Sequence, residues 1–316
     1  MQVIEGVHIA PNWTSAAGAL EGILDHLDAP LPRHAIMGLT GHAWHTCLGT
    51  RDGIVALPNG PLDLDWAAMV ERYASTGYRW ERFAGGQRGE AIAWATAHLD
   101  AGRPLIGFDF HLHEFSVVYG YDRASEGFLV DNVLSDEVGP LALWRDWPSP
   151  AGRIEVFAPV EPVEVDAVDA VGAALGTALA CFAGRDGPDD GQPRGTAALD
   201  AWATALDGDT EVDRAGNAYT LAVLQAARLD GVAFLADLAE SLPELAAPLT
   251  AASRAIADET QALSPLLTLF PFPSGGHGNV ANAGLRRAAA MALRRAAGHE
   301  RVAAAAIEEA VEALSA

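Results

Sequence analysis

PLIGFDFHLHEFSVVYGYDRASEGFLVDNV, residues 104–133, is the stretch of sequence that decides the fold. Apolar and polar residues alternate over 108–112, a β-branched and aromatic run follows over 115–121, and residues 128–130 are apolar again. This pattern predicts two strands joined by a short turn. Antiparallel pairing can then bring His113, near the start of one strand, beside Asp131, near the end of the next. A histidine held by a carboxylate is the base half of a nucleophilic triad, so the hairpin is a candidate catalytic site.

Composition and charge exclude several classes of function. The net charge of −22 on 316 residues disfavours binding to nucleic acid or to an anionic membrane, and it favours basic ligands such as amines. All 20 basic residues are arginine, so Schiff-base chemistry, pyridoxal phosphate attachment and a P-loop lysine are excluded, and no cofactor is expected. No apolar run approaches the ~20 residues of a membrane span. The N-terminal residues do not resemble a signal peptide, so we expect a cytoplasmic protein.

The order of the predicted elements indicates two domains of the α+β class. Residues 1–160 combine early helices, including 15–27, with later strands, so we expect an α+β domain rather than alternating βαβ units. Residues 161–316 show helical patterns and are expected to form an all-helical domain. The helices predicted there are Ala167–Phe182, Thr196–Leu206, Ala215–Leu242, Leu245–Leu267 and Asn279–Ala316.

The candidate nucleophile is Ser15, at the start of the first predicted helix, where free N–H groups and the helix dipole favour negative charge. The pattern SAAGALEGIL at 15–24 resembles the first helix of papain-like peptidases that cleave double-glycine leaders, whose pattern begins with Cys-Gly. The segment 113–122, HEFSVVYGYD, followed by FLVD at 128–131, is similar to that group's histidine strand and the aspartate after it. The stretch MGLTGHAW at 37–44 also fits. Taken together, the motifs resemble proteins with a butirosin-biosynthesis-H-like N-terminal domain followed by a helical C-terminal region.

The resemblance implies a papain-like N-terminal domain and acyl transfer from a carrier-protein thioester to an amine through a cysteine. This chain has Ser15 at the position of that cysteine. In the catalytic hypothesis Ser15 attacks an acyl carbonyl, His113 is the base and Asp131 orients His113. Asn12 is the nearby amide that could help to stabilise the oxyanion. The expected substrate is a small amine or a peptide-like molecule, with a small-molecule or carrier-bound acyl donor.

Three further residues, His42, Trp44 and His111, are assigned to substrate binding. His42 and Trp44 lie in a segment that could line the cleft, and His111 is two residues before His113 on the same predicted strand face. The alternative hypothesis is a non-catalytic binding or accessory protein with the same fold. A hydrogen bond between the Ser15 hydroxyl and a His113 nitrogen would favour the enzyme, and a hydroxyl turned into its own helix would favour the binding protein.

Two other patterns were weighed. His42, His45 and Cys47 form an HxxHxC cluster, but no second ligand pair with metal spacing follows, so no metal site is expected. Four arginines at 286, 287, 294 and 295 form a basic stripe on one predicted helix. We expect this stripe to dock onto acidic surface of the same molecule or at a homodimer interface, and the alternative is an anchor for an anionic group.

Overall fold

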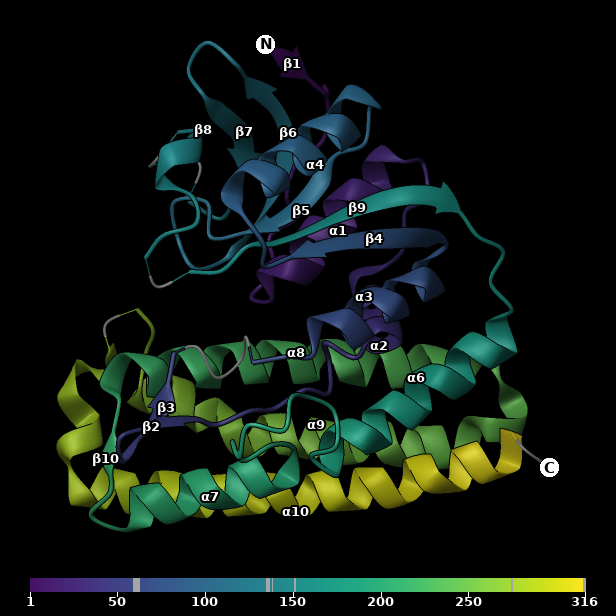
Figure 1. The fold of residues 1–316 in the computed structure, drawn as a ribbon. Helices are drawn as coiled ribbons and strands as arrows, with labels where there is room; N and C mark the ends of the chain where they lie inside the picture. The colour runs from purple at the N-terminus through teal and green to yellow at the C-terminus, as the bar shows by residue number, and fades with distance from the viewer. Residues whose placement is uncertain (59–62, 135–136, 138, 151, 274, 315–316) are drawn as a thin grey trace. The chain divides into compact units, whose positions relative to one another are not determined.

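The centre of the first unit is an antiparallel sheet built around the hairpin predicted at 104–133 (Figure 1). The computed structural model describes residues 1–58, 63–134, 137, 139–150, 152–273 and 275–314. In this part of the chain the sheet has seven strands, in the order β4-β9-β5-β6-β7-β8 with β1 also paired to β6. They are β1 (Gln2–Val3), β4 (Tyr78–Ala84), β5 (Leu105–Phe108), β6 (Phe115–Asp122), β7 (Gly127–Asp131), β8 (Leu141–Leu143) and β9 (Glu155–Pro162).

Four helices accompany this sheet in the chain: α1 (Ser15–His26), α2 (Arg33–Thr40), α3 (Trp66–Arg72) and α4 (Arg88–Asp100). Helix α1 packs on β5 and β6, because Leu20, Ile23 and Leu24 recur at helical spacing and are fully buried. Phe115 on β6 stacks on Phe157 of β9, with ring centroids 5.6 Å apart. The sheet and its helices confirm the α+β class that the sequence predicts.

The second unit is mainly helical. It contains α6 (Ala167–Phe182), α7 (Thr196–Asp207), α8 (Arg214–Ser241), α9 (Ala246–Leu269) and α10 (Ala283–Leu314). Helices α8, α9 and α10 run side by side along most of their length (Figure 1). The predicted helices match these closely, and residues 315–316 of the last prediction lie outside the described residues. No helix in the described part of the chain is long and apolar enough to cross a membrane.

The unit boundaries differ from the expected division near residue 160. Contacts group residues 1–36 with 67–165, and residues 37–66 with 166–316. The segment 37–66 adds β2 (Gly49–Arg51) and β3 (Ile54–Leu57) to the helical unit, where β3 pairs in parallel with β10 (Glu211–Val212). An Asp52–Gly53 turn with positive φ at both residues, 53° and 84°, joins β2 to β3.

A buried arginine explains why the segment 37–66 joins the helices. Arg228 on α8 is fully buried and donates to the Ala43 carbonyl at 2.5 Å and to the Thr46 hydroxyl at 2.6 Å. The same guanidinium forms ion pairs with Glu259 of α9 at 3.1 Å and with Glu300 of α10 at 2.5 Å. A buried charge is tolerated only when it is paired in this way, so these contacts must form together.

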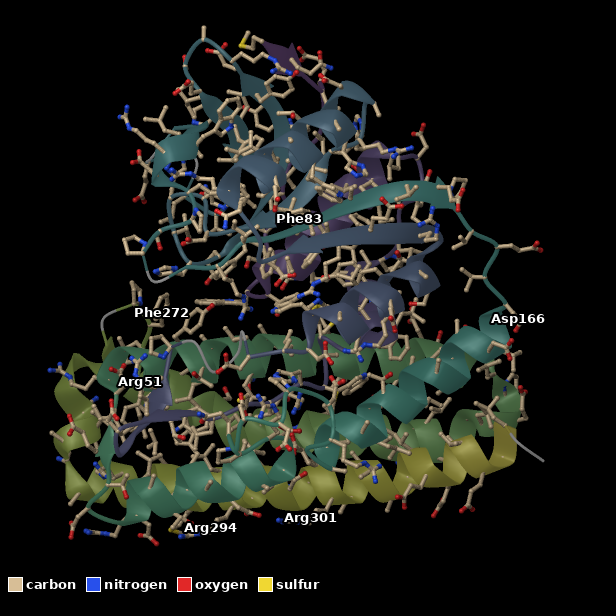
Figure 2. All side chains as sticks on the ribbon, in the orientation of Figure 1. Arg51, Phe83, Asp166, Phe272, Arg294 and Arg301 are labelled. Carbon is tan, nitrogen blue, oxygen red and sulfur yellow. The ribbon has the colours of Figure 1, made fainter. Side chains whose placement is uncertain are left out.

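Two of the four arginines in the basic stripe contact α7, as expected for docking within the molecule. Arg294 (labelled in Figure 2) pairs with Asp207 at 2.8 Å. Arg286 donates to backbone carbonyls at the end of α7. Arg301, six residues beyond the stripe on the same helix, pairs with Asp200 of α7 (Figure 2). Arg295 donates to the Met291 carbonyl of its own helix.

Candidate functional site: the loop between β5 and β6

The loop 109–114 connects β5 to β6 and carries four ionisable side chains, those of Asp109, His111, His113 and Glu114. The sequence predicts that the strand continues over 108–112, but β5 ends at Phe108. Asp109 and His111 both have φ of +69°, a left-handed conformation that non-glycine residues adopt at a cost. A hydrogen bond from the Asp109 amide to the Glu114 carbonyl, 3.1 Å, closes the loop. These two residues persist in a strained conformation because the loop is held at both ends.

Ser15 is hydrogen-bonded to the residues at the end of this loop. It is the first residue of α1 and is 4% exposed. Its hydroxyl donates to the Glu114 carboxylate at 2.5 Å and accepts from the Phe115 amide at 3.0 Å. The Ser15 hydroxyl is therefore bonded on both sides, to the start of β6 rather than to its own helix or to His113.

His113 pairs with Asp109 instead of the predicted Asp131. The His113 Nδ1 atom lies 2.8 Å from Asp109 Oδ1. The histidine side chain is 54% exposed, whereas the Asp109 side chain is 2% exposed. Asp109 Oδ2 accepts a second hydrogen bond, 2.6 Å, from the Ser149 amide. A carboxylate that is buried and bonded twice fixes the orientation of the imidazole.

The register of the hairpin explains why Asp131 is not the partner of His113. Asp131 on β7 lies opposite Val117, well inside β6, whereas His113 lies in the loop before β6 begins. The Asp131 carboxylate instead accepts from the Ile9 amide at 3.0 Å and lies 3.4 Å from His8 Nδ1. Its observed role is to attach the N-terminal segment to the sheet. The predicted arrangement of Ser15, His113 and Asp131 as one hydrogen-bonded set is therefore wrong in its contacts.

The other predicted site residues have separate positions. The Asn12 side-chain carbonyl accepts from the Thr14 amide at 2.9 Å, just before α1. In the helical unit, Trp44 is fully buried against Phe182 and Phe234, and His42 is buried with its ring 6.2 Å from Trp66. Trp44 is thus a core residue of that unit.

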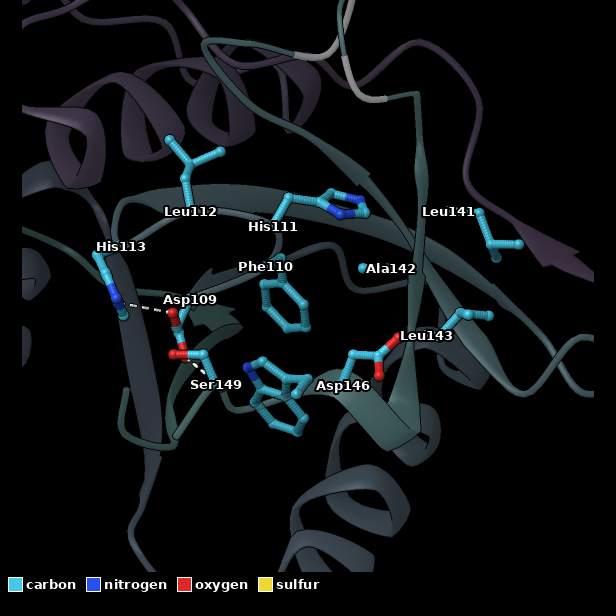
Figure 3. A pocket seen from close by; sticks show the side chains of 11 residues that line it. Asp109, Phe110, His111, Leu112, His113, Leu141, Ala142, Leu143, Asp146 and Ser149 are labelled. Carbon is cyan, nitrogen blue, oxygen red and sulfur yellow. Dashed lines mark hydrogen bonds and ion pairs between the residues drawn. The ribbon is translucent and has the colours of Figure 1, made fainter. Parts of the chain in front are cut away.

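His111 lines a pocket of about 300 Å³ that the loop 109–114 forms with β8 and the segment after it (Figure 3). Phe110 and Trp147 contribute an aromatic pair, stacked at 4.9 Å with an interplanar angle of 11°. Leu141 and Leu143 of β8 add aliphatic surface. Leu112 and Ala142 also line the pocket, and its polar lining comes from Asp109, His111, His113, Asp146 and Ser149.

Sequence reasoning missed Glu114, Asp109 and Asp146. Glu114 directly follows the histidine that the motif emphasised, and Asp109 precedes that histidine by four residues. In a strand, neither position predicts a contact with Ser15 or His113. The observed loop brings Glu114 to Ser15 and Asp109 to His113. The pocket is therefore a product of the loop conformation.

Among the described residues, no group of three or more His, Cys, Asp and Glu side chains could hold a metal ion. Burial raises the pKa of the Cys47 thiol to about 12, so this cysteine is a poor nucleophile at neutral pH.

No model of a known protein family matches the chain, and no curated protein sequence matches it.

Proposed function

We propose that the sheet-bearing unit is a non-catalytic ligand-binding module in which Ser15 has a structural role. The observation that carries this proposal is the 2.5 Å hydrogen bond from the Ser15 hydroxyl to Glu114, together with the bond that the hydroxyl accepts from the Phe115 amide. A serine nucleophile needs a base that accepts its proton during attack. A carboxylate is a weaker base than an imidazole by about two pKa units, so Glu114 is poorly suited to this task.

The position of His113 also favours a binding protein. Its Nδ1 atom is held by Asp109, and the hydrogen bonds of Ser15 go to other residues. The catalytic hypothesis, acyl transfer or amide hydrolysis through Ser15, remains a prediction that the experiment below distinguishes. If the resemblance to papain-like proteins holds, this chain is a pseudoenzyme with that fold and acts as an accessory protein in the cytoplasm.

The test compares the reactivity of position 15 in three proteins. The wild-type protein is exposed to a broad fluorophosphonate probe and its intact mass is measured. We expect no adduct on Ser15. The Ser15→Cys variant is treated with iodoacetamide, and we expect alkylation no faster than that of an exposed thiol, because the Glu114 carboxylate disfavours a neighbouring thiolate.

The matched gain-of-function control is the double variant Ser15→Cys/Glu114→His. It places an imidazole on the residue that contacts position 15, so alkylation should accelerate at least tenfold over Ser15→Cys. An adduct on wild-type Ser15 that disappears in Glu114→Gln would overturn the proposal, because it would identify Ser15 as an activated nucleophile with Glu114 as its base.

A further inference from the structure

The polar groups that line the 300 Å³ pocket differ in the hydrogen bonds and ion pairs that they already make (Figure 3). Both oxygens of Asp109 are bonded, one to His113 and the other to the Ser149 amide. Asp146 has one weak partner, the neighbouring Arg145 at 3.7 Å, and both side chains are largely exposed. Exposed ion pairs of this kind contribute little to stability. A ligand could therefore replace Arg145 as the partner of the Asp146 carboxylate.

The hydrogen bond between His113 and Asp109 determines whether the second ring nitrogen of His113 donates or accepts a hydrogen bond. Because Asp109 is buried and accepts at Nδ1, the neutral imidazole carries its proton on Nδ1. The other ring nitrogen of His113 is then a hydrogen-bond acceptor. The Ser149 hydroxyl, which also lines the pocket, is buried and has no hydrogen-bond partner among the residues that the structure describes.

His111 and the apolar wall complete the pocket. His111 has a φ of +69°, and its ring points toward the side of the pocket formed by β8 (Figure 3). Phe110, Leu141 and Leu143 supply apolar surface below and beside it. The pocket thus combines apolar surface with acceptor groups. Its two carboxylates are the buried Asp109, paired with His113, and Asp146, which is exposed at the pocket margin.

We propose that this pocket binds a small primary ammonium ion with an apolar body, a proposal that rests on the ligand-binding function above and names its ligand class. The ammonium group donates to the Asp146 carboxylate, and the apolar body packs along β8 and Phe110. An ammonium group offers three donors and no acceptor, which matches a margin rich in acceptors. The net charge of −22 adds long-range attraction for a cation.

The experiment measures binding of three probes of similar shape by isothermal titration calorimetry at low ionic strength. The probes are 2-phenylethylamine, 2-phenylethanol and 3-phenylpropionate, which are cationic, neutral and anionic at pH 7.5. We expect the amine to bind at least tenfold more tightly than either other probe. Asp146→Asn should reduce amine affinity at least tenfold, about 1.4 kcal/mol, and should leave the alcohol unchanged.

The matched control is Glu164→Gln. Glu164 is an exposed carboxylate of the same unit that does not line the pocket, so the substitution removes the same charge elsewhere. Amine affinity should change less than twofold in this control. An equal loss of amine affinity in both variants would show that the amine responds only to the overall charge, and it would overturn the proposal.

Two results would separate this inference from the proposed function. Tightest binding of 3-phenylpropionate, or no binding of any probe to a folded protein, would overturn the ammonium assignment and leave the structural role of Ser15 intact. A fluorophosphonate adduct on Ser15 would overturn the non-catalytic function while the preference for the amine could still be read from calorimetry.

Discussion

Ser15 on α1 and Glu114, the last residue of the loop before β6, are joined by a hydrogen bond of 2.5 Å across 99 residues of sequence. The bond fixes the first turn of a helix to the first residues of a central strand. It also makes the Glu114 carboxylate the acceptor of the Ser15 hydroxyl. The same loop that supplies Glu114 supplies the pocket residues Asp109, His111 and His113.

Ser15→Ala should therefore destabilise the sheet-bearing unit. The substitution removes the bond that the Phe115 amide donates to Ser15 and the bond that Ser15 donates to Glu114, at a cost of about 1–3 kcal/mol. Faster hydrogen exchange of the Phe115 amide and a lower urea midpoint would report this loss. Thr14→Ala is the control, because the Thr14 side chain makes no capping hydrogen bond. Hydrogen exchange that rises equally in both variants would contradict the stabilising role of the Ser15 hydroxyl.

Gly152→Ala should disturb the pairing of His113 with Asp109. A Cβ atom at position 152 would lie 1.7 Å from Asp109 Oδ2, so the carboxylate must move. We expect a change in the 15N chemical shift of His113 Nδ1 and weaker binding of 2-phenylethylamine. Gly89→Ala, whose added Cβ meets open space, should change neither quantity. An unaltered His113 signal in Gly152→Ala would show that Asp109 does not depend on this close approach.

Glu259→Gln should stabilise the helical unit at high pH. Burial raises the pKa of Glu259 well above its usual value, with a further contribution from Glu300, although Arg228 opposes the shift. Folding therefore favours the protonated carboxyl, and its stabilisation is present below the unfolded pKa of about 4.3 and is lost as pH rises through the folded pKa. Glutamine stays neutral at every pH and keeps an acceptor for Arg228.

Urea unfolding at pH 5 and pH 8 checks this sign. The advantage of Glu259→Gln over wild type should be larger at pH 8 than at pH 5. Glu240→Gln, at an exposed position on α8, controls for loss of one surface charge and should show no such growth. An advantage that is constant with pH would contradict the direction of the Glu259 shift.

Arg286→Ala should loosen the end of α7. The Arg286 guanidinium donates to the carbonyls of Leu206 at 3.0 Å, Ala205 at 2.6 Å and Gly208 at 2.9 Å. Loss of these charged bonds should cost about 1–3 kcal/mol and increase hydrogen exchange over residues 204–210. Arg287→Ala removes the same charge from an exposed neighbour, and an equal effect there would indicate a general charge effect.

Helices and the hairpin could be predicted from the sequence because their signals are local. Apolar spacing in α1 and in Ala167–Phe182 predicted both helices, and the β-branched run predicted β6. The contacts of the site could not be predicted in the same way. The alternation through Leu112 favoured a strand, yet left-handed φ values at Asp109 and His111 turn that segment into a loop. Tertiary contacts, above all those of Asp109, determine that conformation.

Long-range pairing was the second feature that local patterns could not supply. The two residues of β10 are too few for any periodic signal, and their partner β3 lies in the first fifth of the chain. Likewise, Trp44 resembled a cleft residue in its motif, whereas contacts with Phe182 and Phe234 make it core.

The discontinuous helical unit imposes an order on the folding of this chain during synthesis. Residues 37–66 leave the ribosome before the residues of the other unit that follow them, 67–165, and before their own partners on α6 and α8. Until Arg228 and β10 emerge, Trp44 and β3 have no native surface to cover them. While residues 67–165 are made, this segment lacks its partners in the helical unit, and we expect it to be open to chaperone binding and aggregation during that time.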